Sequence, residues 1–392
     1  MRKLIMLFLL VTGLPFILNA QSPVERVLQE VEKNNTTLSA LRSRVEAEKT
    51  GNRTGIFLHN PEMDLYLLNN RDEQVQRTNF NLVQPFDFPT LLGRKNQLSR
   101  ALNQQLDYEY LQHRQDVLLE AHQIVIDLIY LNALGRELEI RLEHAANIAR
   151  SYEAMLNAGE VNILEHNKAQ INLFNSRKAS ELNAVERASL LARLQALNGG
   201  IELEVSEKEF PVPQIPGVFA EWFEEAAPSN PFLLGAAQQI AISRQEERLA
   251  RAAWLPSFSA GYMVEALPAE RFAGFGMGIS IPLWENRNTV KYARLHTEAM
   301  QQRQTDIETR YFSQLKGMYD QAKSLQELSL NYRSMLQNLD NSGLLLKALE
   351  AGQISLIDYM LELGFYYEAV NMMLETDRQL HKVIANLKHF SQ

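Results

Sequence analysis

Two acidic residues stand at matching places in the chain. Glu165 lies six residues after Gly159, and Asp358 lies six residues after Gly352. A glycine that ends one helix leaves an acid at this distance in the first turn of the next helix, where the dipole stabilises negative charge. The same carboxylates, if they faced a shared water-filled space, would attract cations. The spacing alone leaves both interpretations open.

No other group of residues predicts catalysis or cofactor binding. The chain has eight histidines and no cysteine, and the histidines do not have the spacing of a zinc-binding helix. The sequence also has no glycine-rich phosphate loop and no nucleophile elbow. We therefore expect a protein that is not an enzyme and that holds no cofactor and no metal ion.

The first 20 residues have the pattern of a secretory signal peptide. Met1-Arg2-Lys3 is positively charged, residues 4–18 are almost wholly apolar, and Ala20 is a small residue suited to cleavage. An uncleaved anchor helix is the alternative, but the apolar run is shorter than the roughly 20 residues that span a bilayer. The formal net charge is −8 and becomes more negative when Arg2 and Lys3 are removed, which argues against a nucleic-acid partner.

The distribution of proline predicts two very long helices. None of the 13 prolines lies in 90–210 or 283–392, and a proline inside a helix costs about 3 kcal/mol or more. Apolar residues in the first stretch recur at alternating steps of three and four, as in the seam of a coiled coil. This first seam, interrupted at Gly135, consists of Val117, Ala121, Ile124, Leu128, Leu131, Leu138, Leu142, Ala145, Ala149, Tyr152 and Leu156. The second, weaker seam, interrupted at Ser329, consists of Tyr311, Leu315, Met318, Ala322, Leu325, Tyr332, Leu336 and Leu339.

The two halves of the chain form an internal repeat. The matching segments are Asn60-Pro61 with Leu255-Pro256, Gln84-Pro85-Phe86 with Ile281-Pro282-Leu283, and Ala158-Gly159-Glu160 with Ala351-Gly352-Gln353. Both glycines can adopt a positive φ and turn the chain. Asn162 and Ser355, each three residues later, are suited to cap the returning helix.

Each half also contains two short segments that alternate with period two, cleanly between apolar and small residues in the second half and less cleanly in the first. They cover residues 61–70, 77–86, 256–266 and 271–282 approximately, long enough for a tilted strand to cross a bilayer. Two soluble hairpins are the alternative, although the glycines and the terminal aromatic residues favour a lipid-facing band. Four strands cannot close a barrel, and open edges are not tolerated in hydrocarbon, so membrane strands here require several copies of the chain.

The order of these elements, given twice, resembles the TolC-type family of outer-membrane efflux proteins. The motifs that carry the resemblance are Tyr152-x6-Gly159-x3-Ile163-Leu164-Glu165, Gly352-x3-Leu356-Ile357-Asp358, Asn60-Pro61 and Ile281-Pro282-Leu283. The resemblance extends from about residue 23 to 390. The chain departs from some relatives because it has no cysteine to carry a lipid. It also has Leu361 and Lys168 where members often have a second acid.

The resemblance implies a mainly α protein with a small membrane β-barrel. Its duplicated long-helix coiled-coil hairpins and four transmembrane strands per protomer would close a 12-stranded barrel and an α-helical tunnel as a homotrimer. Such a protein lies in the outer membrane of a Gram-negative cell and extends into the periplasm. It conducts passively, in efflux or type I secretion, with a periplasmic adaptor (membrane fusion) protein and an inner-membrane RND or ABC pump.

The family's functional residues map onto three places in this sequence. Asp358 and Glu165 would line the periplasmic aperture. The hairpin tips that meet the adaptor would be Gly159, Glu160, Gly352 and Gln353. The strand–helix junctions would be Pro61, Pro85, Pro256 and Pro282. The alternative is a periplasmic coiled-coil adaptor or scaffold protein without a barrel, which two hairpins and no glycine-rich β-domain make less favoured.

These patterns predict the following organisation. The signal peptide covers 1–20. The first repeat, 21–210, has its long helix at 89–156 and its return helix at 162–198. A connector covers 211–229. The second repeat, 230–392, has helices at 231–254, 284–350 and 355–390.

Overall fold

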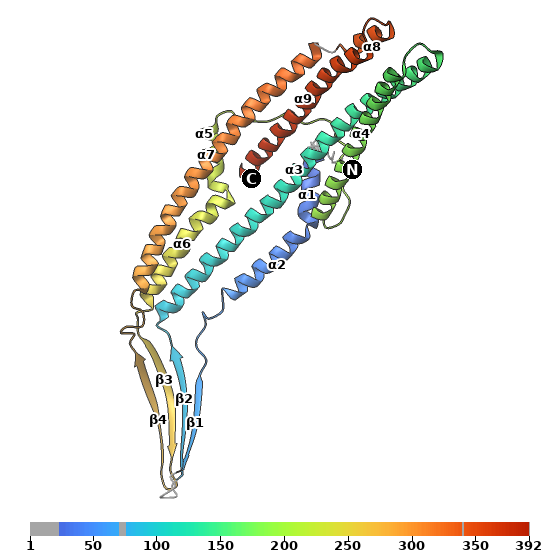
Figure 1. Ribbon diagram of the computed structural model, residues 1–392. Helices are drawn as coiled ribbons and strands as arrows, with labels where there is room; N and C mark the ends of the chain where they lie inside the picture. The colour runs from blue at the N-terminus through green and yellow to red at the C-terminus, as the bar shows by residue number, and fades with distance from the viewer. Residues whose placement is uncertain (1–22, 70–75, 339–340, 392) are drawn as a thin grey trace, which may run out of the picture.

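The computed structural model describes residues 23–69, 76–338 and 341–391. The molecule is elongated, with a narrow four-stranded sheet at one end and long helices extending from it side by side (Figure 1). The predicted signal peptide, residues 1–20, lies outside the described residues.

The sheet is antiparallel and joins the two halves of the chain. Its strands are β1 (Glu62–Asn69), β2 (Gln76–Phe86), β3 (Ser257–Ala266) and β4 (Arg271–Ser280), in the spatial order β1-β2-β3-β4. β2 and β3 come from different repeats and pair over nine residues of each strand. The predicted membrane segments are therefore strands of one sheet.

The helices of the first half begin with α1 (Pro23–Asn34) and α2 (Thr36–Gly51), which precede β1. α3 (Pro89–Ala158) follows β2 and has 70 residues, so it is about 105 Å long at a rise of about 1.5 Å per residue. Its first residue is a proline, where no intrahelical N–H bond is lost. α4 (Ile163–Leu197) returns along α3 as the second arm of a hairpin.

The second half contains α5 (Phe219–Ala226), the short 3₁₀ helix η1 (Ala227–Ser229) and α6 (Pro231–Ala252) before its strands. After β4 come α7 (Thr289–Asn338), α8 (Ser342–Glu350) and α9 (Leu356–Ser391). α5 lies within the segment 211–229, for which the sequence predicted only a connector.

The prediction of one helix over 284–350 is wrong in two places. No helix covers 284–288, and the rest is divided into α7 and α8. Asn288 has a φ of 70°, which no right-handed helix can contain, and α7 begins directly after it. α7 and α8 are separate helices, and their facing ends carry weak helix formers, Asn338 as the last residue of α7, Asn341 before α8 and Gly343 as the second residue of α8.

The first seam forms the core of the long hairpin. All of its residues are buried or half-buried, and Ala121, Leu128 and Leu131 are at most 2% exposed. The interruption at Gly135 marks a close approach of α3 and α4, because a Cβ there would lie 2.9 Å from the side-chain nitrogen of Asn183. The described residues of the second seam are likewise buried or half-buried; Leu339 lies outside them.

The interruption of the second seam at Ser329 accommodates a buried charge. Asp377 on α9 is 3% exposed and accepts a hydrogen bond from the Ser329 hydroxyl. Its other carboxylate oxygen accepts one from Arg333 at 2.5 Å. An alanine in place of Ser329 would remove one of the two partners of this carboxylate.

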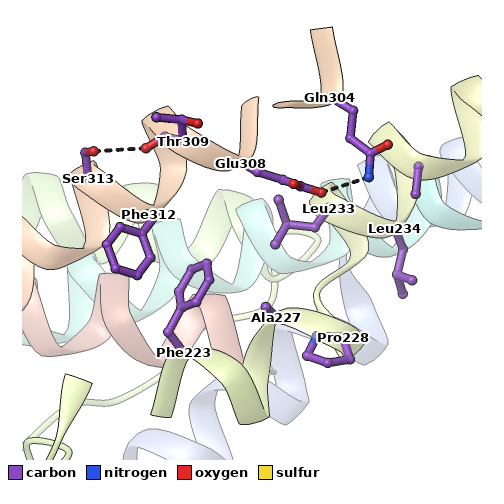
Figure 2. Close-up of a pocket in the computed structure, with 11 residues that line it drawn as sticks. Phe223, Ala227, Pro228, Leu233, Leu234, Gln304, Glu308, Thr309, Phe312 and Ser313 are labelled. Atoms are coloured by element: carbon purple, nitrogen blue, oxygen red, sulfur yellow. Dashed lines mark hydrogen bonds between the residues drawn. The ribbon is translucent and has the colours of Figure 1, made fainter. Parts of the chain in front are cut away.

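Aromatic residues fill the middle of the molecule, where α5 packs on α7 and on the end of α9. Phe219, Phe223 and Phe390 form its centre, and the rings of Phe223 and Phe390 stack with centroids 5.4 Å apart. Beside them an open groove of about 540 Å³ separates α5, α6 and α7. Figure 2 shows Phe223 and Phe312 near each other, and Glu308 accepting a hydrogen bond from the Gln304 side chain. All four residues line the groove.

The buried carboxylate generates a first prediction. Asp377→Ala leaves the Ser329 hydroxyl buried without a partner, so we expect the free energy of unfolding to fall by about 1–3 kcal/mol. The matched control is Asp320→Ala, which removes an exposed ion pair with Lys316 on α7 and should cost less than about 1 kcal/mol. Chemical denaturation measures both. Equal losses would contradict a structural role for the Asp377 cluster.

Candidate channel site

The pairing register of the sheet separates apolar from charged side chains. Residues directly opposite each other in antiparallel strands lie on one face, and successive residues alternate between faces. Leu82 is opposite both Met63 and Tyr262, and Tyr262 is opposite Phe275. We call the face that contains this row the apolar face. Its large side chains are Met63, Leu65, Leu67, Phe80, Leu82, Phe86, Phe258, Tyr262, Val264, Phe275, Met277 and Ile279.

The opposite face, which we call the polar face, has four of the five charged residues of the strands. These are Glu62, Asp64, Arg77 and Glu265, while Arg271 lies on the apolar face at the loop end of β4. Arg77 and Glu265 form an ion pair of 2.7 Å across β2 and β3. The polar face of β4 carries glycines at 274, 276 and 278, so little side-chain volume projects from its middle, although Phe272 lies on this face at the loop end. The two faces therefore suit different surroundings.

No described part of the chain covers the apolar face. Phe275 is 91% exposed and Met277 is 93% exposed. A large apolar side chain left in water forgoes about 1.5–3 kcal/mol of burial free energy. A contiguous apolar surface of this kind marks a membrane or protein contact.

Both edges of the sheet are also open. Among the described residues, β1 pairs only with β2, and β4 pairs only with β3. Unpaired backbone N–H and C=O groups along an edge need a partner, most of all in hydrocarbon. The sheet is thus incomplete at two edges and one face.

The four junction prolines lie together at the helical end of the sheet. Pro61 and Pro256 directly precede β1 and β3, Pro85 is the last but one residue of β2, and Pro282 lies two residues beyond β4. A proline at a strand end removes a donor where ladder bonding stops anyway. The sequence had placed them at the strand–helix junctions, and the structure puts all four at or near strand ends on the helical side of the sheet.

The two hairpin tips have the same backbone geometry. Gly159 and Gly352 have φ of 76° and 67°, the left-handed conformation that other residues adopt at a cost. The N–H groups of Glu160 and Gln353 donate to carbonyls five residues back, those of Met155 and Ala348, at 2.8 Å. This is the Schellman pattern that ends a helix.

The residues after each tip cap the returning helix, as the sequence predicted. The Asn162 side chain accepts hydrogen bonds from the backbone N–H groups of Leu164 and Glu165, at 2.9 and 3.0 Å. Ser355 accepts one from the N–H of Asp358 at 3.2 Å.

The two acids differ in their local roles. The Asp358 carboxylate accepts hydrogen bonds from the hydroxyl and the N–H of Ser355, at 2.6 and 3.3 Å, which completes a reciprocal capping box. Glu165 is half-buried in the first turn of α4, and Asp358 is exposed in the first turn of α9. Asp358 therefore has a structural function at the tip, whatever else it faces.

Sequence reasoning missed a polar contact between the two hairpins. Arg141 on α3 donates to the side chain of Asn371 on α9 at 2.9 Å, and its guanidinium lies 4.3 Å from the centre of the Tyr367 ring. Burial lowers the pKa of Arg141 from its ordinary value. No spacing in the sequence signals this contact, because the partners lie 230 residues apart.

Two further observations bear on the class of site. Within the part of the chain that the structure describes, no three His, Cys, Asp or Glu side chains are grouped so as to hold a metal ion. α3 contains an 18-residue window of mean hydropathy 1.4, long and apolar enough to cross a membrane. The core helix of a soluble protein passes the same test, and this helix packs on α4 over the first seam.

No protein-family model and no curated protein sequence matches the chain. Solved structures do. The Campylobacter jejuni CmeC outer membrane channel is 14% identical, over 94% of this chain and 86% of that one, with a TM-score of 0.75. CusC, whose structure is described in terms of transmembrane channel formation, is 14% identical over 94% and 92% of the two chains, with a TM-score of 0.78.

This chain has the outer-membrane channel fold. The Neisseria gonorrhoeae MtrE outer membrane channel, in its open state, is also similar, at 15% identity and a TM-score of 0.69 over 94% of this chain and 88% of that one. The expected fold, long helical hairpins with a small four-stranded sheet, is confirmed. At such low identity the similarity shows the fold alone.

The tip geometry generates a second prediction. Gly352→Ala forces a left-handed alanine, so we expect a loss of about 1 kcal/mol in the free energy of unfolding. Gly364→Ala is the matched control. Gly364 lies inside α9, a Cβ there would meet no atom within 4 Å, and alanine should stabilise the helix by about 0.5–1 kcal/mol.

Denaturant titration together with hydrogen exchange of the α9 amides measures the two changes. A Gly352→Ala protein as stable as the Gly364→Ala protein would contradict the left-handed tip.

Proposed function

We propose that this chain is the outer-membrane subunit of an efflux or type I secretion conduit, which passes substrate passively from the periplasm to the exterior. The observation that carries the proposal is the uncovered apolar face of the sheet, with Phe275 and Met277 more than nine-tenths exposed. Strands of 8 to 11 residues are long enough to cross the apolar band of an outer membrane when tilted. The fold supports the same function.

The open sheet edges support a homotrimer. β1 and β4 are opposite edges, so copies that pair β1 with β4 associate head to tail and close as a ring. Three copies of four strands would make the 12-stranded barrel that the family resemblance implies. The polar face, with Glu62 and Asp64, would then line its water-filled interior.

The helices would continue the barrel as a tunnel into the periplasm. The turn between α3 and α4 and the turn between α8 and α9 lie far from the sheet, which is where a periplasmic adaptor would contact them (Figure 1). The residues of these turns, Gly159, Glu160, Gly352 and Gln353, are exposed. An inner-membrane RND or ABC pump would supply the energy. A periplasmic adaptor or scaffold without a barrel is the weaker proposal, because it offers no cover for the apolar face.

Asp358 and Glu165 are proposed to line the aperture between the tips. Three symmetry-related copies of an exposed Asp358 would form a ring of negative charge that favours cations. The capping bond from Ser355 would hold each carboxylate in the first turn of α9. Glu165, half-buried, is the smaller contributor to this ring.

A pair of substitutions on opposite faces tests the membrane proposal. Met277→Glu places a carboxylate on the apolar face and should destabilise the inserted protein, by less than the roughly 2–4 kcal/mol that Arg or Lys costs at the bilayer midplane. Met263→Glu, the matched control, makes the same change on the polar face, where Met263 is opposite Asn81 and Gly274. The measurement is folding into lipid vesicles, followed by urea titration.

We expect loss of insertion for Met277→Glu and near-normal insertion for Met263→Glu. Equal effects of both, or a chain that stays soluble as a monomer in the periplasmic fraction, would overturn the proposal. The parent protein should fractionate with the outer membrane and run as a heat-modifiable oligomer on SDS gels.

The aperture is tested by Asp358→Asn, which removes the charge but keeps an oxygen that can accept from Ser355. In planar bilayers we expect a lower preference for cations, read as a shift of the reversal potential towards zero in a salt gradient. Glu165→Gln should produce a smaller shift. An unchanged reversal potential for Asp358→Asn would remove Asp358 from the aperture.

A further inference from the structure

A partly enclosed cavity of about 520 Å³ lies at mid-height, away from both the sheet and the tips. It is bounded by the start of α1, the middle of α3, residues 207–214 and the end of α9. Cavities of a few hundred Å³ with apolar walls and a few polar groups are the usual form of small-molecule sites. Nothing in the proposed conduction uses this one.

Two helices line the cavity with the same order of side chains. On α3, Gln115 and His122 lie two turns apart on one face, with Leu118 and Leu119 between them. On α9, His381 and Lys388 lie two turns apart, with Ile384 and Ala385 between them. Each wall is therefore apolar in the middle and polar at its two ends.

The polar groups of the α3 wall are open to whatever fills the cavity. Gln115 is 5% exposed as a residue, and neither its amide nor the His122 imidazole has a hydrogen bond to another described residue. Neither group is among the fully enclosed side-chain atoms that lack a partner, so both can bond to a molecule in the cavity. Such groups in a native fold normally serve a ligand or ordered water.

The part of the cavity lined by the two histidines disfavours charge, although the lining also includes the charged residues Glu25, Glu207, Glu209 and Lys388. Burial, reinforced by the positive charge of Lys388, lowers the pKa of His122 to about 4. Burial also lowers the pKa of His381 to about 4, although Asp377 opposes the shift, and its ring stacks on Phe210 at 4.6 Å. Both imidazoles are neutral at pH 7, so each offers one donor and one acceptor.

We propose that this cavity binds an uncharged, mostly apolar small molecule through a carbonyl or hydroxyl group that bonds to Gln115 or His122. Aromatic or aliphatic parts of the molecule would contact Leu119, Ile384 and Phe210. Each wall is polar at its ends and apolar in its middle, which matches a ligand of this kind. A row of ordered waters matches less well, because the waters in the middle would find few hydrogen-bond partners. The proposal does not depend on membrane insertion of the sheet.

Photolabelling with benzophenone tests the site, because this uncharged diphenyl ketone has two apolar rings and one acceptor. The signal-cleaved protein is reconstituted in lipid nanodiscs, irradiated with rising concentrations of benzophenone, and mapped by peptide mass spectrometry. We expect saturable labelling of peptides that contain 115–129 and 381–389. Gln115→Leu should raise the half-saturating concentration about fivefold, the equivalent of one lost hydrogen bond.

Two further variants complete the design. Leu119→Trp fills the cavity and should abolish the saturable label. Gln104→Leu makes the same change as Gln115→Leu on an exposed part of α3 and should leave it unchanged. Melting temperatures show whether each variant folds. If Leu119→Trp does not fold, the comparison of Gln115→Leu with Gln104→Leu still tests the proposal.

The proposal is overturned if these peptides are not labelled or if their labelling does not saturate. It is also overturned if the half-saturating concentration is the same for Gln115→Leu as for the parent protein. The cavity then holds water only. Peptides from 62–86 and 257–280 report separately on contact with lipid-dissolved benzophenone. Their failure to label would count against the membrane proposal and leave the cavity result intact.

Discussion

A four-stranded sheet with two open edges and one uncovered apolar face is the constraint on which the rest of this structure depends. The chain cannot satisfy it alone, since every strand of the described residues is already in the sheet and no helix lies over Phe275 or Met277. Water leaves the apolar face unburied, and lipid leaves the edges unpaired. Surroundings that supply further strands, together with lipid or another apolar surface, meet both needs.

The same sheet sets how the two repeats are joined. β2 ends next to the start of α3, and β3 begins just after α6, so the β2–β3 pairing brings these helices together at the sheet. The four junction prolines lie at the helical end of the sheet, two directly before a strand, one inside β2 and one beyond β4. The long hairpins extend in one direction from this common base (Figure 1).

Much of this could be predicted from the sequence, because the signals are local and repeated. Proline-free stretches with heptad spacing predict long helices. The duplicated Ala-Gly turns, followed by Asn162 and Ser355, predict two capped tips. The separation of α7 from α8 was missed because apolar residues such as Leu336 and Leu344 lie on both sides of it, although Asn338, Asn341 and Gly343 near the two helix ends are weak helix formers. α5 was missed because the prolines around it outweighed its short apolar pattern, and its stability comes from Phe219 and Phe223 packing on distant helices.

The sequence predicts the backbone conformation of the candidate site better than the interactions of its side chains. Positive φ at Gly159 and Gly352 follows from residue type, since glycine adopts that conformation without strain. The capping box of Ser355 and Asp358 also follows from spacing, and it shows why an acid at this place is no proof of an aperture. A carboxylate that stabilises the first turn of α9 would be retained at the tip with or without a channel, so only a charge-selective measurement separates the two roles.

Contacts between the repeats combine two kinds of chemistry. Apolar residues of α3 and α9, such as Ile148 and Leu363, pack in a shared cluster near the tips. Polar contacts lie lower down, where Asp127 meets Lys382 at 2.7 Å and Arg141 meets Asn371 at 2.9 Å. Apolar packing is not directional and would tolerate a small shift of one helix along the other. A hydrogen bond, in contrast, breaks when its donor and acceptor move apart by about one ångström. The polar pairs therefore fix the height of one repeat against the other, and they had to be found in the structure because each joins residues more than 200 positions apart.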